Sequence, residues 1–340
     1  MTETAVSAAL PAEVPRRRAV QLLGGLRELA LLPAIAGLIV AGTLISSAFL
    51  TKANLVNVAQ ESAALGTVVV AETLILLTGS FDLSLQSIYG LAPMIGAWLI
   101  VPASAHGQGA QLNWTIGVLV TLLVGLGVGL FNGLLIVKAG FNAFILTLAM
   151  LILLAGIQVG IVSGETIYAM PSQFIYLGSA YWAGVPVSAL VTGALFLASG
   201  LFLRYHRTGR AIYAIGGNAE AARAAGIKVD RVRIGVFVTA GTLAALAGLM
   251  TAGQVVAVTA NQGNNLIFTV FAAAVIGGIS LDGGRGRMLG ALTGVILLAL
   301  VNNILTLSQI QTFWIDAANG AIILLALGLA RLFGTTQPGG

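Results

Sequence analysis

The sequence predicts an all-α polytopic membrane protein of about ten transmembrane helices. Of its 340 residues, 58% are hydrophobic and only 8% are charged, whereas soluble domains carry about 25% charged residues. Apolar runs of about 20 residues, the length that crosses a bilayer as a helix, recur along most of the chain. With ten spans and a cytoplasmic N-terminus, every Lys and Arg except Lys52 falls on the cytoplasmic side, as the positive-inside rule requires.

The expected spans follow one another with short connections. We place them near residues 29–50, 56–78, 84–101, 114–137, 141–163, 185–203, 234–258, 266–280, 289–307 and 313–333. The eighth is short, so it is expected to be tilted, broken or re-entrant. The first follows a basic stretch but is longer than the apolar core of a signal peptide, which favours a retained anchor helix. A transmembrane domain of 29–333 thus separates two cytoplasmic tails, 1–28 and 334–340.

Several function classes are excluded by what the sequence lacks. There is no cysteine, and the two histidines, His106 and His206, are far apart, so no metal site is expected. No lysine follows a glycine, which excludes a phosphate-binding loop, and no catalytic triad pattern occurs. The basic charge is explained by membrane topology, so no nucleic-acid partner is expected. We therefore predict a protein that is not itself an enzyme and that carries no catalytic residue.

Glycines at helical spacing predict close helix contacts. A glycine every four residues gives a helix a smooth face that another helix can approach closely. Two such rows occur: Gly125, Gly129 and Gly133, and then Gly156, Gly160 and Gly164.

Ionisable side chains inside the spans are rare and are candidates for a solute path. Glu61 and Glu72 are eleven residues apart, which places them on nearly the same face of a helix. Asn54 and Asn57 extend this stripe outward. An acid at mid-bilayer costs about 2.5–3.5 kcal/mol on insertion scales, so it should face protein or water. The stripe either lines a path for a hydroxylated solute or forms hydrogen bonds that fix helix packing.

Further polar residues directly follow the second expected span or lie within later spans. Asp82 and Ser84 are expected either to cap the next helix or to lie on the solute path. Buried amides in spans bond to neighbouring helices more often than to ligands. The scattered polar positions are Asn132, Asn142, Thr147, Gln158, Asn302 and Asn303, and of these we assign Asn132, Thr147 and Asn302 to the candidate path.

The one long charged connection, 204–233, holds seven Lys or Arg residues and two acids. Within it, Asn218 is a favourable N-cap and Gly226 a favourable C′ residue, with an alanine-rich helix of about two turns between them. So short a helix needs a partner surface to remain formed in water. It is either a well-capped connection or a docking helix for a cytoplasmic protein.

Several motifs resemble the permeases of ribose/xylose/galactose-type ABC importers. Thr208-Gly-Arg210, Ala214-Ile-Gly-Gly-Asn218 and Ala221-Ala222 with Gly226-Ile227 are similar to the cytoplasmic loop of that family. The other motifs that fit are Gly79-Ser-Phe-Asp-Leu-Ser84, Phe131-Asn-Gly133, Phe144-Ile-Leu-Thr147 and Ala272-Ala-Ala-Val-Ile-Gly-Gly-Ile-Ser-Leu-Asp-Gly-Gly284. They occur in the family's order over about 29–333.

The resemblance implies a type II importer fold in the bacterial inner membrane, with both termini cytoplasmic. It implies three kinds of partner: a cytoplasmic ABC ATPase, a periplasmic or lipid-anchored sugar-binding protein, and a second permease subunit, identical or related. ATP would be used by the ATPase, and this chain would carry no cofactor. The residues that would couple to the ATPase are Gly209, Arg210, Gly217, Asn218, Glu220, Ala221, Ala222, Arg223 and Gly226.

The resemblance also implies transport of a monosaccharide or related polyol by alternating access. The sequence departs from the family pattern at Ser80-Phe81 and at Gln86, and Glu72 lies outside that pattern, which leaves the solute open. The alternatives are an ABC permease for branched-chain amino acids or nucleosides, an ATP-independent carrier or channel, and a membrane-anchored scaffold. The polar stripe argues against a scaffold, and the capped helix would have no role in an independent carrier.

Overall fold

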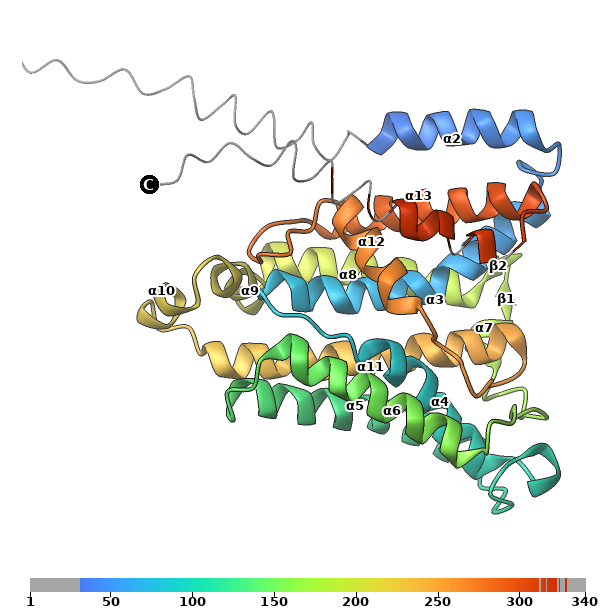
Figure 1. Cartoon of the computed structure of the whole chain (residues 1–340), viewed down its shortest axis with the longest axis horizontal. Helices are drawn as coiled ribbons and strands as arrows, with labels where there is room; N and C mark the ends of the chain where they lie inside the picture. Colours follow the sequence, from blue (N-terminus) through green and yellow to red (C-terminus); the bar gives the residue numbers. More distant parts are fainter. Residues whose placement is uncertain (1–30, 312, 316, 323, 325–327, 329–340) are drawn as a thin grey trace, which may run out of the picture.

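The protein is a bundle of helices that run mainly lengthwise (Figure 1). The structure, a computed structural model, describes residues 31–311, 313–315, 317–322, 324 and 328. The longer helices are α2 (Leu31–Ile45), α3 (Lys52–Leu77), α4 (Leu85–Ile100), α5 (Trp114–Val137), α6 (Ala143–Ile161), α8 (Val187–Tyr205), α9 (Arg207–Gly217), α11 (Val229–Val255), α12 (Leu266–Ile276) and α13 (Met288–Leu307). The shorter elements are η1 (Ala103–Ala105), α7 (Tyr176–Ser179), β1 (Tyr181–Trp182), β2 (Val185–Pro186) and α10 (Ala219–Ala224).

The predicted all-α polytopic class is confirmed. Among the described residues, six helices are long and apolar enough to cross a membrane, namely α3, α5, α6, α8, α11 and α13. Helices α2, α4 and α12 coincide with three further expected spans but are shorter. The last expected span, 313–333, is helical at 313–315 and 317–322 and otherwise falls largely outside the described residues. Ten spans therefore stays a prediction, as do the two tails.

The core is built around α3 and α11. The inner half of α3 is buried on all sides, and α11 packs against α3, α4 and α5. Gly125 and Gly129 of α5 lie so close to α11 that an added Cβ would approach the carbonyl oxygens of Gly241 and Phe237 at 2.4 and 2.3 Å. The first glycine row is thus confirmed as a close helix contact. The second row is different, because a Cβ on Gly156 or Gly160 would meet no atom within 4 Å.

The two ends of the bundle differ in character (Figure 1). At one end, α9 and α10 project beyond the long helices, near the loops that follow α5 and α12. The other end carries α7 and the two-residue strands β1 and β2, which pair as a hairpin. The basic segments are joined at the α9–α10 end, where Lys138 forms an ion pair with Asp230 at 2.8 Å. This grouping agrees with the charge pattern expected of a cytoplasmic face.

Two non-helical segments lie within the bundle, one before α12 and one before α4. Helix α12 has eleven residues and is therefore about 16 Å long, roughly half of a 30 Å hydrocarbon layer. The preceding segment, 256–265, is non-helical, and it begins at the β-hairpin end, where Val258 bridges to Ile167. The segment 78–84 likewise separates α3 from α4. The eighth span is therefore short, as expected, and its tilted, broken or re-entrant path stays a prediction.

Candidate functional site: translocation pocket and coupling surface

The short helix α10 has the caps that the sequence predicted. The Asn218 side-chain oxygen accepts a hydrogen bond from the Ala221 amide at 2.9 Å, which is an N-cap interaction. At the other end Gly226, with φ +83°, donates to the Arg223 carbonyl, and Ile227 donates to the Ala222 carbonyl. This bond pair is the Schellman motif, so both ends of a two-turn helix are closed by its own residues.

One side of α10 packs against the rest of the protein, and the opposite side is exposed. Ala222 is 4% exposed and packs with Ile215 and Val229 in a small apolar cluster. Gly209 is also buried, in the first turn of α9 against the end of α8. Ala222 and Gly209 were both predicted to couple to the ATPase. Because both are buried, they support the exposed surface of α9 and α10 from below. The seven that lie on the outside are Arg210, Gly217, Asn218, Glu220, Ala221, Arg223 and Gly226. Their contact with an ATPase stays a prediction.

Helix α9 was missed in the sequence, where 204–233 was expected to be a loop around one short helix. It is amphipathic and buries Ile212 and Ile215 against the bundle, three residues apart, while Arg207 and Arg210 remain exposed. The Tyr213 hydroxyl donates to the Gly286 carbonyl at 3.0 Å. Burial raises the pKa of this hydroxyl, and the nearby Arg287 guanidinium opposes the shift. The spacing of the two isoleucines was the signal that could have revealed α9.

Four of the predicted path residues lie close together in one buried cluster, namely Glu72, Asp82, Ser84 and Asn132. Asp82 Oδ1 accepts hydrogen bonds from the amide and the hydroxyl of Ser84, and Asn132 on α5 donates to the Ser84 hydroxyl at 2.8 Å. Glu72 lies close enough to Asp82 for the two carboxyl groups to interact electrostatically. All four residues are 0% exposed. Ser84 makes no side-chain bond to the α4 amides, so the expected cap on α4 by Ser84 was wrong.

The expected polar stripe on α3 is divided by the packing. Glu61 and Asn57 are exposed, whereas Glu72 is enclosed, and neither of its carboxyl oxygens has a hydrogen-bond partner among the described residues. Asn54 instead forms two hydrogen bonds of 2.9 and 2.8 Å with Asn303 of α13. The stripe is therefore not one continuous lining within a single chain.

The two remaining candidates sit on other helices. Thr147 is buried and donates to the Ala143 carbonyl of its own helix at 2.8 Å. Asn302 is half-buried, and its side-chain oxygen has no hydrogen-bond partner in the described part of the chain.

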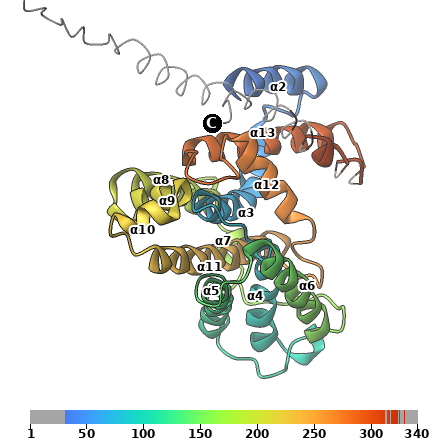
Figure 2. The same ribbon diagram turned by 60° about the vertical axis from the view of Figure 1, so that its left-hand side comes forward.

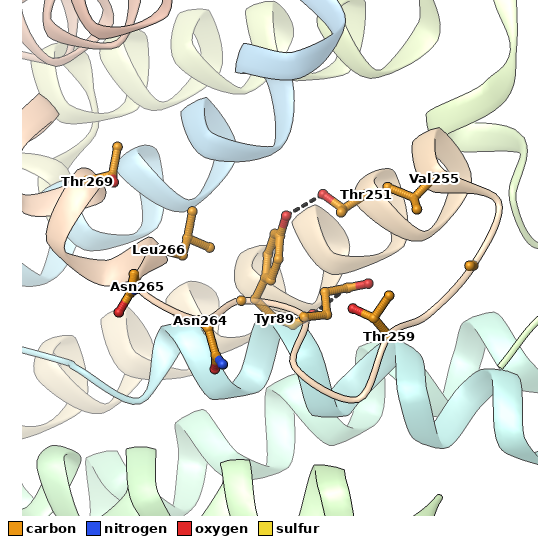
Figure 3. Close-up of a pocket in the computed structure, with 11 residues that line it drawn as sticks. Tyr89, Thr251, Val255, Thr259, Asn264, Asn265, Leu266 and Thr269 are labelled. Atoms are coloured by element: carbon orange, nitrogen blue, oxygen red, sulfur yellow. Dashed lines mark hydrogen bonds between the residues drawn. The ribbon is translucent and has the colours of Figure 1, made fainter. Parts of the chain in front are cut away.

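A pocket of about 330 Å³ opens where the helices are interrupted, and none of the eight predicted path residues lines it. It lies between α4, the end of α11, the segment 256–265 and the start of α12 (Figure 3). Its lining residues are Tyr89, Thr251, Val255, Ala257, Thr259, Gln262, Gly263, Asn264, Asn265, Leu266 and Thr269. Not one of these side chains carries a charge. The Tyr89 and Thr251 hydroxyls are hydrogen-bonded to each other, and Asn264 and Asn265 are exposed.

Three glutamines hold the irregular backbone beside the pocket. Gln262 donates to the carbonyls of Tyr89 and Gly248 at 3.1 and 3.2 Å. Gln158 of α6 donates to the Gln262 carbonyl, and the Gln86 side chain accepts from the Ile267 amide. Non-helical backbone at membrane depth is tolerated only where protein or a water-filled cavity satisfies it. The glutamines meet this requirement with neutral side chains and so give the pocket a fixed wall.

The signal for the pocket along the chain is weak. Asn264 and Asn265 fell in the connection between two expected spans, where exposed amides are ordinary. The informative sign was the shortness of the eighth span, because a half-length helix must begin inside the bilayer and place its preceding residues there.

Comparison with known proteins identifies the family. The family described as "Branched-chain amino acid transport system / permease component" matches residues 54–327. The ribose import permease protein RbsC of Escherichia coli K12 is 32% identical over 287 residues, covering 83% of this chain and 87% of the relative. The ribose import permease protein RbsC of Bacillus subtilis strain 168 is 32% identical over 298 residues, covering 86% and 89%.

A third relative carries a different name. The autoinducer 2 import system permease protein LsrC of Photorhabdus laumondii is 32% identical over 255 residues, covering 75% of this chain and 74% of the relative. The same kind of comparison with solved structures found no match. The family match and the matches to named permeases over most of their length agree with the motif resemblance. They also agree with a multi-pass protein of the inner membrane. The chain therefore belongs to this family of transport-system permease components and is an ABC importer permease.

Proposed function

We propose that this permease carries a monosaccharide or a closely related polyol into the cell. The observation that supports this proposal most directly is the pocket, whose eleven lining residues offer amides and hydroxyls but no charge. Side-chain amides both donate and accept hydrogen bonds, which suits the hydroxyl groups of a sugar. Pockets of about 300–1,000 Å³ are typical of small-molecule sites. The names of the ribose and autoinducer 2 relatives point the same way.

The family description names branched-chain amino acids, and the pocket argues against them. An amino acid is a zwitterion, and burying an unpaired charge in an apolar site is costly. The start of α12 supplies a helix end for the carboxylate, but the lining supplies no acidic side chain for the ammonium group. The lining supplies no charged side chain, so an uncharged solute fits better. A nucleoside is also uncharged and is separated from a sugar by the experiment below.

We assign the two ends of the bundle to two partners. The exposed side of α10, together with the basic residues around it, is the docking surface for a cytoplasmic ABC ATPase. The opposite end, with α7 and the β1–β2 hairpin, faces the periplasm and receives the solute from a binding protein. A second permease subunit, identical or related, completes the path. This chain needs no cofactor, because the ATPase binds and hydrolyses the ATP.

The transport cycle follows from this arrangement as alternating access. Closure of the ATPase pair displaces α10 and reorients the helix bundle, so that the pocket is open first to the periplasm and then to the cytoplasm. Both termini lie in the cytoplasm in this orientation.

Uptake measurements in the native host test the proposal. We expect deletion of the gene to abolish accumulation of at least one radiolabelled sugar among ribose, xylose and galactose. Complementation with the wild-type gene should restore it, whereas uptake of leucine and uridine should not change. Loss of leucine or uridine uptake with all sugar uptake intact would overturn the assignment.

A further inference from the structure

Four glycines bring three distant segments of the chain together at one point. Gly79 follows α3, Gly216 lies near the end of α9, and Gly283 and Gly284 lie between α12 and α13. We call these four residues the glycine junction. It lies at the α9–α10 end of the bundle, where α9 approaches α3 in both views (Figures 1 and 2).

The contacts at the glycine junction are between backbones. The Gly284 amide donates to the carbonyl of Leu77, the last residue of α3, at 3.0 Å. A Cβ added to Gly216 would lie 2.0 Å from that carbonyl oxygen and 2.3 Å from the Gly284 nitrogen. A Cβ on Gly283 would lie 2.7 Å from the Gly79 backbone. Such distances leave no room for a side chain, so the segments move together or separate.

Two of these segments lead directly to the pocket. The segment 78–84 continues into α4, whose Tyr89 lines the pocket. The loop that contains Gly283 and Gly284 follows α12, whose Leu266 and Thr269 also line it. The third segment, α9, continues into α10. Both interrupted helices of the pocket wall are thus connected through the glycine junction to the helix that carries the docking surface.

Two of the three segments at the glycine junction are also held by side-chain hydrogen bonds. Tyr213 of α9 is bonded to the Gly286 carbonyl, which ties α9 to the loop beyond α12. The segment 78–84 is fixed to α5 through the chain of hydrogen bonds from Asp82 to Ser84 to Asn132. These bonds attach the start of α4 to α5, five residues beyond Gly79.

We propose that the glycine junction transmits the motion of α9 and α10 to α4 and α12, and so sets the opening of the pocket. Its glycines are positioning residues for transport, since they act on the pocket only through the two helices. The proposal rests on the proposed function, in which an ATPase moves α10. It predicts that separating the glycine junction changes the pocket even when no ATPase is present.

The first experiment uses the full-length permease in membrane vesicles without its partners. Because the chain has no cysteine, Thr269→Cys provides a single reporter in the pocket for labelling by a maleimide. We expect Gly216→Ala to change its labelling rate at least threefold. The control is Gly235→Ala on α11, because a Cβ there meets no atom within 4 Å. Tyr213→Phe removes one bond without adding an atom and should change the rate in the same direction by a smaller factor.

The second experiment measures ATP hydrolysed per sugar imported in the complete transporter. The glycine junction variants should raise this ratio severalfold, with transporter levels in the membrane unchanged. An unchanged ratio and an unchanged labelling rate in Tyr213→Phe and in a folded Gly216→Ala would overturn the proposal. If Gly216→Ala does not fold, Tyr213→Phe alone decides. Failure of the proposed function would look different, because the wild-type transporter itself would then import no sugar.

Discussion

Asp82 and Ser84 are joined by two hydrogen bonds to a single carboxylate oxygen, 2.9 Å from the Ser84 amide and 2.5 Å from its hydroxyl. The same hydroxyl accepts a bond from Asn132, so one serine connects the segment before α4 to α5. All three residues are fully buried. Asp82 therefore satisfies a backbone amide at the start of α4, as expected of a cap, and the same stretch also forms an interhelical connection.

Replacing this serine should destabilise the protein. Ser84→Ala leaves a buried amide donor on Asn132 without its partner and removes one bond from Asp82. An unsatisfied buried polar group costs about 1–3 kcal/mol, which we expect as the loss in free energy of unfolding. Thermal unfolding in detergent measures it. Thr306→Ala, which removes an exposed hydroxyl bonded only to its own helix, is the control and should have little effect. Equal stability of the two variants would contradict the connection.

Removing the N-cap of α10 should uncouple ATP hydrolysis from uptake. Asn218→Ala deletes the bond to the Ala221 amide, and loss of an N-cap costs about 1 kcal/mol, a large fraction of the stability of so short a helix. We expect uptake to fall severalfold while ATPase activity continues. Asn113→Ala, which removes the N-cap of α5 away from the docking surface, is the matched control and should keep the coupling. Tight coupling in both variants would contradict the docking assignment.

The pocket asparagines should control apparent affinity for the solute. Asn264→Ala removes one hydrogen-bonding side chain from the lining. A net loss of about 1 kcal/mol per bond corresponds to a rise in KM for uptake of roughly fivefold. Asn261→Ala changes a neighbouring exposed asparagine outside the lining and should leave KM unchanged. If both variants behave alike, the pocket is not the solute site.

Glu72 should be dispensable for solute recognition. Its carboxyl group is fully buried beside Asp82 and away from the pocket. Glu72→Gln keeps the size of the side chain and removes an ionisable group from a fully buried site, so we expect no loss of stability at neutral pH and an unchanged KM. Uptake kinetics and thermal unfolding of the same preparation provide the two readouts. A large rise in KM would return Glu72 to the solute path.

Single cysteines should report the proposed orientation. Cysteines in place of Gln108 and Tyr176, both exposed, should react with an impermeant maleimide from the periplasm. Those in place of His206 and Arg285 should react only after the cytoplasmic side is opened. The chain has no native cysteine, so each label is unambiguous. A reversed pattern at any site would break the ten-span assignment at that point.

The features that the sequence predicted correctly are local ones. The caps at Asn218 and Gly226 depend on residues within one short segment, and a glycine every four residues marks Gly125 and Gly129 whatever lies opposite. The packed all-α class follows from composition and apolar run length.

Apart from α9, whose isoleucine spacing is a local signal, the features that were missed depend on distant partners. The pocket wall is held by Gln86 and Gln158, which come from α4 and α6, far from 256–265 in the sequence. Glu72 and Glu61 share a helix face, but only the packing around α3 decides that one is enclosed and the other exposed. Three of the motifs that carried the family resemblance meet at the glycine junction, and no spacing along the chain indicates that they touch.

The neutral glutamine wall has a consequence for the energy source of transport. Moving one elementary charge across a membrane at 100 mV involves about 2.3 kcal/mol, so a charged lining or solute would couple import to the membrane voltage. An uncharged sugar held by uncharged amides and hydroxyls moves no charge through the field. The membrane potential then neither drives nor opposes the passage of the solute. On the proposed function, accumulation against a gradient draws on ATP hydrolysis by the partner ATPase and should persist in cells whose voltage has been collapsed.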